Sequence, residues 1–412
     1  MSKDRIVVTG MGAITPIGIG ISSYWSNLLL GKSGTDYIHR FDPSQLPVKI
    51  AAEVKDFSPY DFLPKKLVRK TDIFMQFALI AAKEALTDSN IHVDSDRIGI
   101  VLGTALGGIS TMASSQEQIT MQGSYRLSPH TVPKMLGNIA AAQIAIAHDI
   151  QGPSLTVNTA CSSGADAIGM ASMLLKSGQA DAVVAVGAES ILTGLMAAGL
   201  SSAHALSTQN ENPERASRPF DFHRDGFVMG EGGGAVVLET LDFARKREAE
   251  IKAELLGYAN NTDAYHVTSP EPTGRGEISC MQRALKQAEL KPSQIDYVNA
   301  HGTATKLGDQ VETKSLKAVF GESLVKEIPV SSTKGATGHM MGAGGVTEII
   351  ACIKSIREGI VPPTINYEHP DPECDLDFVP NHSRKVDVKV AMSNAFGFGG
   401  QNTSLIVGKY KQ

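Results

Sequence analysis

The feature that most constrains the fold of this chain is a regular alternation of short apolar strands with helical patterns. Four apolar segments of the first half have the length and composition of buried strands, namely residues 5–12, 97–103, 154–160 and 181–188. Helical patterns lie between them; residues 72–89, for example, begin at an acidic residue and carry apolar residues at helical spacing. Strands that alternate with helices predict an α/β protein with largely buried sheets.

The same pattern returns after about residue 250. "IKAELLGYA", "IDYVNAHG", "KEIPVSSTKG" and "VAMSNAFGFGG" are strand-like, whereas "SCMQRALKQAEL" and "GVTEIIACIKSIREG" are helix-like. No low-complexity linker separates the halves. We therefore expect residues 1–250 and 251–412 to form two units that pack tightly together, although the repetition does not by itself establish a duplication.

Charge, hydropathy and cysteine usage exclude several classes of protein. A net charge of −5 argues against a nucleic-acid surface, and no apolar run approaches the ~18 residues of a membrane span. The four cysteines are widely spaced without a CxxC pair, which argues against a disulfide framework or a zinc site: Cys161, Cys280, Cys352 and Cys374. We expect a protein of the reducing cytoplasm, with no nucleic-acid or membrane partner.

Two glycine-containing segments suggest nucleotide binding but lack the full motifs. "GKS" at residues 31–33 has Ser26 where a phosphate loop needs its first glycine, and a helix-like segment precedes it instead of a strand. "GMGAIT" at residues 10–15 lacks the third glycine of the dinucleotide fingerprint. We therefore expect no organic cofactor.

One cysteine stands at the junction of a predicted strand and a predicted helix. In "NTACSSGADAIGMA", Cys161 follows the strand-like residues 154–160, and helical spacing continues to residue 176. The free N–H groups and the dipole of a helix N-terminus favour an anion and lower a thiol pKa. Cys161 is therefore a candidate nucleophile; the alternative is a small buried hydrophobic residue.

Two histidines lie at predicted strand ends, where functional residues of α/β proteins collect. His301 follows "IDYV" in "NAHGTAT", and His339 lies in the glycine-rich loop "STKGATGHMMGAGG". A cysteine with distant histidines is a candidate catalytic set. Metal binding is the competing interpretation, but there is no HExxH motif and no third ligand at a telling interval, so we expect no metal.

Taken together, these motifs resemble those of the β-ketoacyl-ACP synthases. The resemblance is carried by "NTACSSG", "NAHGTATKLGD", "SSTKGATGHMMGAGG" and "SNAFGFGGQN", and also by residues 216–239 and 362–380. It covers essentially the whole chain in the family order, and it is strongest to the synthase II branch of bacterial dissociated fatty-acid synthesis. The two histidines distinguish this branch from the initiating branch, which uses a histidine and an asparagine.

The resemblance implies a fold and a reaction. The expected fold is the thiolase-like fold, in which two similar α/β halves stack as five layers, α-β-α-β-α, and form a homodimer. Cys161 would take an acyl chain from acyl carrier protein, with the N–H groups of Cys161 and Phe398 as the oxyanion hole. His301 and His339 would donate hydrogen bonds to the enolate left when malonyl-ACP loses its carboxyl group. The product would be a 3-oxoacyl-ACP two carbons longer.

The resemblance also implies roles for residues around the triad. Lys334 would orient the site electrostatically, and Glu348 would pair with it. The remaining residues would contact substrate: Thr303 and Thr305 for pantetheine, Phe396 and the gating Phe398 at the acyl pocket, and Leu106 and Leu200 at its wall. The alternatives are a surface lysine, β-propensity for the threonines, and core packing for the apolar side chains.

Acyl carrier proteins are acidic, so a basic docking patch is expected. "PKKLVRK" supplies one, in which three of the four basic residues share a helical face: Lys65, Lys66, Arg69 and Lys70. A solvated charge run is the alternative. His204 stands where the family often has arginine, which puts one carrier contact in doubt.

Three other functions stay open from the sequence. A ketosynthase of a type II polyketide or aryl-polyene pathway would share the Cys-His-His set and could pair with a different subunit as a heterodimer. A non-catalytic chain-length partner would keep the fold, although such partners typically lack the nucleophile. A CoA-dependent thiolase would use a second cysteine late in the chain, which "AFGFGG" does not supply.

Overall fold

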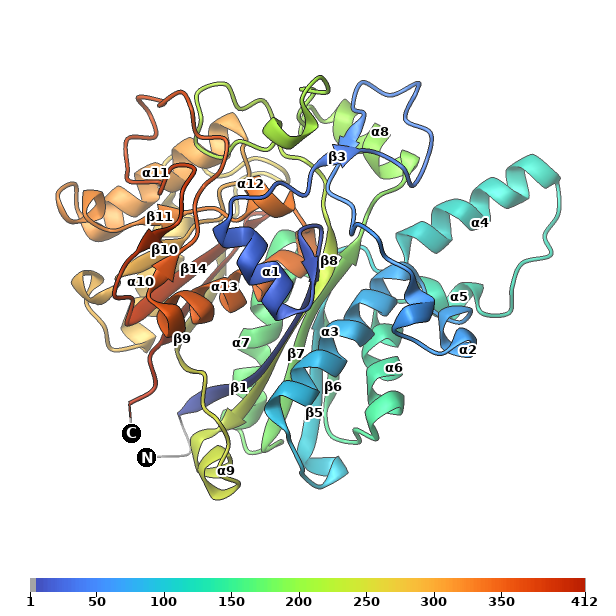
Figure 1. The fold of residues 1–412 in the computed structure, drawn as a ribbon, viewed down its shortest axis with the longest axis horizontal. Coiled ribbons are helices and arrows are strands. Elements are labelled where there is room, and N and C mark those ends of the chain that lie inside the picture. Colours follow the sequence, from blue (N-terminus) through green and yellow to red (C-terminus); the bar gives the residue numbers. More distant parts are fainter. Residues whose placement is uncertain (1–4, 412) are drawn as a thin grey trace.

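A continuous sheet of two similar halves forms the frame of the protein, which a computed structural model describes for residues 5–411 (Figure 1). From the junction outward, the first half contains β1 (Ile6–Thr15), β8 (Glu231–Thr240), β7 (Ala182–Ser190), β5 (Ile98–Gly103) and β6 (Ser154–Val157). The second half contains β9 (Ala253–Thr262), β15 (Gln401–Gly408), β14 (Val390–Gly397), β10 (Tyr297–Asn299) and β11 (Val330–Ser331). The halves meet where β1 pairs with β9.

The two halves repeat the same topology. From the junction outward, the successive pairings of each half are antiparallel, antiparallel, parallel and parallel. In each half, the first sheet strand lies beside the last, followed by the fourth, the second and the third. This repetition in space supports the duplication that the sequence pattern alone did not establish.

Helices cover both faces of the sheet and form a central layer between its halves. Helices α3 (Ile73–Ser89) and α6 (Asn138–His148) pack on the outer face of the first half. Helices α7 (Ser163–Lys176) and α13 (Gly344–Glu358) lie between the halves, and α10 (Arg275–Gln287) and α11 (Lys306–Phe320) cover the outer face of the second. The predicted five-layer thiolase-like fold is confirmed (Figure 1).

Alternation of side chains along each strand allows one sheet to pack against two hydrophobic cores, one on each face. Side chains of successive residues point to opposite faces, so Val184 and Val186 of β7 pack with α3, whereas Val183 and Ala185 pack toward α7 and α13. Because both of its faces are covered, β1 is buried along its whole length and is mostly apolar.

Short elements complete the fold. The helices are α1 (Ile21–Leu29), α2 (Lys65–Val68), α4 (Ile109–Gln122), α5 (Thr131–Met135), α8 (Gly194–Ser202), α9 (Leu241–Lys246) and α12 (Lys334–Thr337). The strands are β2 (Gly18–Ile19), β3 (Asp36–Tyr37), β4 (Ile50–Ala51), β12 (Ile360–Val361) and β13 (Arg384–Lys385). Helix α4 projects away from the body (Figure 1). Among residues 5–411, no helix has the length and apolar character needed to cross a bilayer.

The connection between the halves passes through α9, which follows β8 and precedes β9. The division at residues 1–250 and 251–412 falls in this connection, and we retain it as the proposed boundary.

Candidate active site

Cys161 lies in the turn between β6 and α7. The predicted strand 154–160 ends earlier, at Val157, because the chain turns through a short 3₁₀ helix at Ala160–Ser162. Ala160 has a φ of 50°, in the left-handed region that alanine rarely adopts, and such strain is common at functional sites. The Cys161 side chain is 5% exposed and packs in an apolar cluster with Leu200, Met341 and Phe398.

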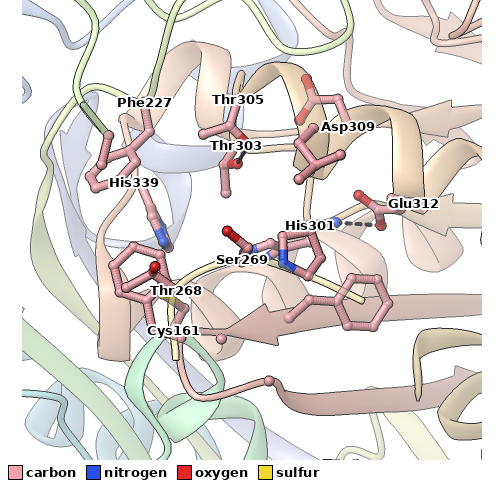
Figure 2. Close-up of a pocket in the computed structure, with 18 of the residues that line it drawn as sticks. Cys161, Phe227, Thr268, Ser269, His301, Thr303, Thr305, Asp309, Glu312 and His339 are labelled. Carbon is pink, nitrogen blue, oxygen red and sulfur yellow. Dashed lines mark hydrogen bonds between the residues drawn. The ribbon is translucent and has the colours of Figure 1, made fainter. Parts of the chain in front are cut away.

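Two histidines of the second half meet this cysteine. His339 Nε2 lies 3.1 Å from Cys161 Sγ. The ring of His301 lies 5.4 Å from that of His339, nearly perpendicular to it at 86°. One ligand atom from each residue lies within 4.8 Å of the others. Figure 2 shows the imidazole of His339 directed toward Cys161, so the structure brings together the three residues that the sequence singled out.

Backbone hydrogen bonds hold both histidines in place. The N–H groups of His301 and Gly302 each donate to the Glu312 carboxylate, at 2.8 Å. The N–H of His339 donates to Val228 O at 2.7 Å, which ties its loop to the first half. Sequence reasoning missed Glu312; its place eleven residues after His301, on a helix that follows the histidine turn, is the signal that could have found it.

The electrostatics keep both imidazoles neutral. Burial lowers the pKa of His301 and of His339 well below the ordinary value, and the nearby Lys334 charge lowers both further. Among residues 5–411, neither Nδ1 atom has a hydrogen-bond partner. Neutral imidazoles can donate from Nε2 without carrying a charge themselves.

The prediction of a lowered thiol pKa is wrong. Burial raises the pKa of the Cys161 thiol to about 11, because removing the sulfur from water penalises the thiolate more than its surroundings stabilise it. The N–H groups of Phe398 and Cys161 and the Lys334 charge act in the opposite direction and lower this pKa. These two N–H groups are the ones expected at the oxyanion hole.

Lys334 and Glu348 form a buried ion pair. Lys334 Nζ donates to Glu348 Oε1, and both side chains are about 3% exposed. Burial raises the pKa of Glu348, whereas the Lys334 ammonium lowers it. Lys334 is therefore a buried residue and not a surface lysine. Its positive charge lowers the pKa of Cys161, His301 and His339.

A cavity of about 230 Å³ opens over the cysteine and the histidines. Among the predicted substrate contacts, Thr303 and Thr305 line this cavity (Figure 2). Phe396 and Phe398 line it as well. The hydroxyl groups of the two threonines lie 3.1 Å apart, and the Phe396 ring lies 6.0 Å from that of His301. His204 also lines it.

Two predicted wall residues lie outside the lining of this cavity. Leu106 is 38% exposed, and Leu200 is buried in the apolar cluster around Cys161.

The cavity also contains a carboxyl group that the sequence did not suggest. Glu277 is buried, and its Oε2 atom has no hydrogen-bond partner among the described residues.

The predicted carrier-docking residues are all exposed on and just after α2: Lys65, Lys66, Arg69 and Lys70. The helix ends at Val68, so it is shorter than the predicted shared face of Lys66, Arg69 and Lys70 requires.

Cys161, His301 and His339 could also hold a metal ion by distance alone. Metal-bound histidines normally donate the other ring N–H to a partner, and here both Nδ1 atoms have none within residues 5–411. The Lys334 charge further disfavours a cation. The arrangement favours a developing oxyanion beside the sulfur.

Comparison with known proteins gives matches along nearly the whole chain. Residues 3–244 match the model of the β-ketoacyl synthase N-terminal domain, and residues 252–368 match that of the C-terminal domain. The chain is 43% identical over 412 residues to 3-oxoacyl-[acyl-carrier-protein] synthase 2 of Coxiella burnetii, covering 99% of each chain.

Two solved structures share the fold. The ishigamide ketosynthase/chain length factor has a TM-score of 0.91 at 33% identity, with 99% of each chain covered. A type II PKS acyl carrier protein in complex with its ketosynthase bound to the hexaketide (AntDE:AntF) has a TM-score of 0.89 at 32% identity, again with 99% of each chain covered.

Proposed function

The chain belongs to the β-ketoacyl synthase family, and on this premise we propose that it is a 3-oxoacyl-[acyl-carrier-protein] synthase of fatty-acid synthesis. It is a condensing acyltransferase that joins a cysteine-bound acyl chain to the two-carbon unit of malonyl-ACP. The observation that carries the proposal is the meeting of Cys161 Sγ with two neutral imidazoles at the N-terminus of α7.

The first half-reaction transfers the acyl chain to Cys161. The sulfur attacks the thioester carbonyl of acyl-ACP, and the carbonyl oxygen becomes an oxyanion. The N–H groups of Cys161 and Phe398 both act on the sulfur, so they are suited to bind an oxyanion on a carbon attached to it. The thiol proton passes to His339 Nε2, 3.1 Å away, and then to the departing carrier thiolate.

Proton transfer to His339 is unfavourable on its own, because the thiol pKa is high and the imidazole pKa is low. Oxyanion formation therefore assists this transfer, and the thiolate is a small fraction of the protein before a thioester binds. This coupling protects the sulfur from other electrophiles.

The second half-reaction condenses the two units. The bond from the malonyl carboxylate to its α-carbon breaks, and carbon dioxide and an enolate form. For this step both imidazoles carry their proton on Nε2, the tautomer opposite to the one in which His339 accepts the thiol proton, and their Nε2–H groups hydrogen-bond the enolate oxygen. The α-carbon then attacks the acyl-cysteine, the C–S bond breaks, and the Cys161 thiolate takes up one proton per turnover.

The remaining substrate contacts follow from the cavity. Thr303 and Thr305 offer hydroxyl groups to a pantetheine amide. Phe398 is proposed as the gate, since it touches both the cavity and the apolar cluster, and Gly399 and Gly400 after it have φ values of 84° and 68°. Leu106 and Leu200 are proposed to face the acyl chain.

Two protein partners are proposed. Acyl carrier protein would dock on the exposed residues Lys65, Lys66, Arg69 and Lys70, as an acidic partner on a basic patch. A second ketosynthase-like chain, in a homodimer, would cover the edge strand β6, whose Leu155 is 39% exposed. Helix α6, which contacts β6, carries Ile146, which is 75% exposed. A heterodimer is the alternative, since one structural relative is a ketosynthase/chain length factor.

The cytoplasm is the proposed location. All four cysteines are free thiols and all are buried, which fits a reducing compartment.

Light scattering of the purified protein tests the proposed homodimer. A mass equal to that of the monomer would contradict it.

Intact-mass measurement with peptide mapping tests the proposed function. The protein is incubated with hexanoyl-, octanoyl- and palmitoyl-carrier protein, and Cys161→Ala is the control. We expect an acyl increment on the Cys161 peptide of the parent protein only.

A second function, extension of a polyketide chain, is favoured by the likeness to the hexaketide-bound ketosynthase. Acylation by oxo-acyl carriers alone would support that function and contradict the first.

A further inference from the structure

Glu189 is the penultimate residue of β7, close to the nucleophile, and its carboxylate accepts hydrogen bonds from two separate loops. The side chain is fully buried. Oε1 accepts from Thr104 Oγ1 at 3.1 Å and from the N–H of Leu106 at 3.2 Å. Oε2 accepts from the N–H of Ala105 at 2.5 Å and from that of Gly342 at 3.3 Å. One carboxylate therefore joins a loop of the first half to a loop of the second.

The first loop follows β5 and reaches the surroundings of the nucleophile. Ala105 packs against the apolar cluster that contains Cys161. Its carbonyl oxygen accepts a hydrogen bond of 2.9 Å from Asn158 Nδ2, three residues before the cysteine. The next residue, Leu106, is an exposed apolar side chain. The loop is thus tied both to Glu189 and to the turn that carries the sulfur.

The second loop lies directly against the sulfur. Met341 Sδ is 3.8 Å from Cys161 Sγ, and Met341 precedes the Gly342 that donates to Glu189. A Cβ on Gly342 would lie 2.8 Å from Glu189 Oε2 and 2.9 Å from Ala105 N. The two loops are therefore in backbone contact at Glu189, and glycine alone fits between them.

The first carbons of an acyl chain attached to the Cys161 sulfur have to lie among the side chains of this apolar cluster. We propose that Glu189 is a positioning residue that clamps the Thr104–Leu106 loop to the Met341–Gly342 loop, and that this clamp sets the chain lengths the acyl site accepts. This inference rests on the proposed function. Glu189 contacts no reacting atom; it acts through the two loops that it holds.

The chemistry of the four contacts requires a carboxylate. Three of the four partners are backbone N–H groups and the fourth is the Thr104 hydroxyl, and an ionised carboxylate accepts from all of them without donating. Burial raises the pKa of Glu189 to about 7, whereas these four hydrogen bonds lower it and so favour the carboxylate. Glutamine has the same shape but one acceptor atom, and its NH₂ group would face two N–H donors. Aspartate keeps both acceptors but is one methylene shorter.

Chain-length profiles of acylation test the inference. Values of kcat/KM for transfer to Cys161 are measured with butyryl-, octanoyl- and dodecanoyl-carrier protein for the parent, Glu189→Gln, Glu189→Asp and Thr104→Val. For Glu189→Gln we expect the dodecanoyl/butyryl ratio to change by about tenfold or more, the size of losing charge-assisted hydrogen bonds. Glu189→Asp and Thr104→Val should shift the ratio in the same direction by less.

Glu239→Gln is the matched control. Glu239 is an equally buried glutamate on the neighbouring strand β8, at the opposite end of β7, where it accepts from Arg247 Nε at 2.7 Å. This variant should lose stability and keep the parent profile. Decarboxylation of malonyl-carrier protein without an acyl chain should change by less than about threefold in Glu189→Gln, because the histidines keep their own supports.

Equal losses for all chain lengths in the Glu189 variants, or an unchanged profile, would overturn the inference and leave a structural role. If Glu189→Gln does not fold, Thr104→Val carries the test, because it removes one contact and keeps the carboxylate. Failure of the parent protein to acylate Cys161 with any chain would instead overturn the proposed function itself.

Discussion

His339 Nε2 lies 3.1 Å from Cys161 Sγ, although 178 residues separate the two in the chain. The contact joins the two halves of the fold, since the cysteine precedes α7 and the histidine precedes α13. Burial favours the neutral form of each partner, so the pair is a thiol beside an imidazole before substrate binds.

The neutral pair predicts how the thiol reacts with pH. Iodoacetamide attacks the thiolate, and the pKa of Cys161 is about 11, so the alkylation rate should rise about tenfold per pH unit from pH 7 to 9 without a plateau. Mass spectrometry of the Cys161 peptide measures the rate, with Cys161→Ala as the blank. A plateau near pH 8 would show that the pKa is lower than the burial of the sulfur implies.

Loss of the His301 imidazole should slow malonyl decarboxylation much more than acylation of Cys161. His301→Ala leaves the contact of His339 with Cys161 intact, so acylation should stay within about tenfold of the parent protein, whereas malonyl decarboxylation should fall about 10²–10⁴-fold. Both steps are followed by the mass of the enzyme and of the carrier product. His223→Ala, at an exposed histidine, is the control and should leave both steps unchanged. Equal losses of acylation and decarboxylation in His301→Ala would refute this division.

The buried pair of Lys334 and Glu348 should behave as a unit in stability. Lys334→Ala leaves an unpaired buried carboxylate and should lower the free energy of unfolding by about 3–5 kcal/mol. Lys334→Met/Glu348→Gln removes both charges and should recover most of that loss, while condensation stays slow because the positive charge is gone. Urea unfolding at pH 7 compares the variants. A double variant no more stable than Lys334→Ala would be inconsistent with this account.

Glu277 should make stability depend on pH. Its folded-state pKa lies well above its ordinary value of 4.5, mainly through burial and then through the charge of Glu312. Below pH 4.5 the Glu277 carboxyl is protonated in both the folded and the unfolded protein, so its ionisation does not change the free energy of unfolding. As pH rises further, the unfolded chain ionises while the folded chain stays neutral, so stability is lost until the folded pKa is passed.

Glu277→Gln removes this loss. The difference in the free energy of unfolding between Glu277→Gln and the parent protein should grow as the pH rises above 5, at a rate of up to about 1.4 kcal/mol per pH unit. Differential scanning calorimetry measures it, with the exposed Glu211→Gln as a control that should show no trend. A constant difference across this range would mean that Glu277 is ionised in the folded protein.

Local patterns in the sequence were sufficient for much of the fold. The apolar segment 97–103 is β5, and residues 72–89 are α3 with Asp72 as its N-cap. Such elements depend on residues a few positions apart, whose period of 2 or 3.6 is visible in one dimension. The triad was also accessible, because Cys161, His301 and His339 each stand in a distinctive motif at a strand or helix end.

The carboxyl groups around the site were not accessible in this way. Glu189 and Glu277 stand in segments with no motif of their own, and Glu312 is marked only by its place after the histidine motif. The hydrogen-bond partners of Glu312 and Glu189 are 10 to 153 residues away in the chain. Each becomes meaningful only when the two halves bring N–H donors or a second carboxyl group beside it.

The amino-acid order by itself determined the alternation of strands and helices, the residue types of the active site and the family to which the chain belongs. The tertiary structure alone decided the distances between those residues and the direction of each pKa shift. The physical reason is burial. The Cys161 thiol precedes a helix whose dipole favours an anion, yet its pKa rises to about 11 because the packed halves exclude water from the sulfur.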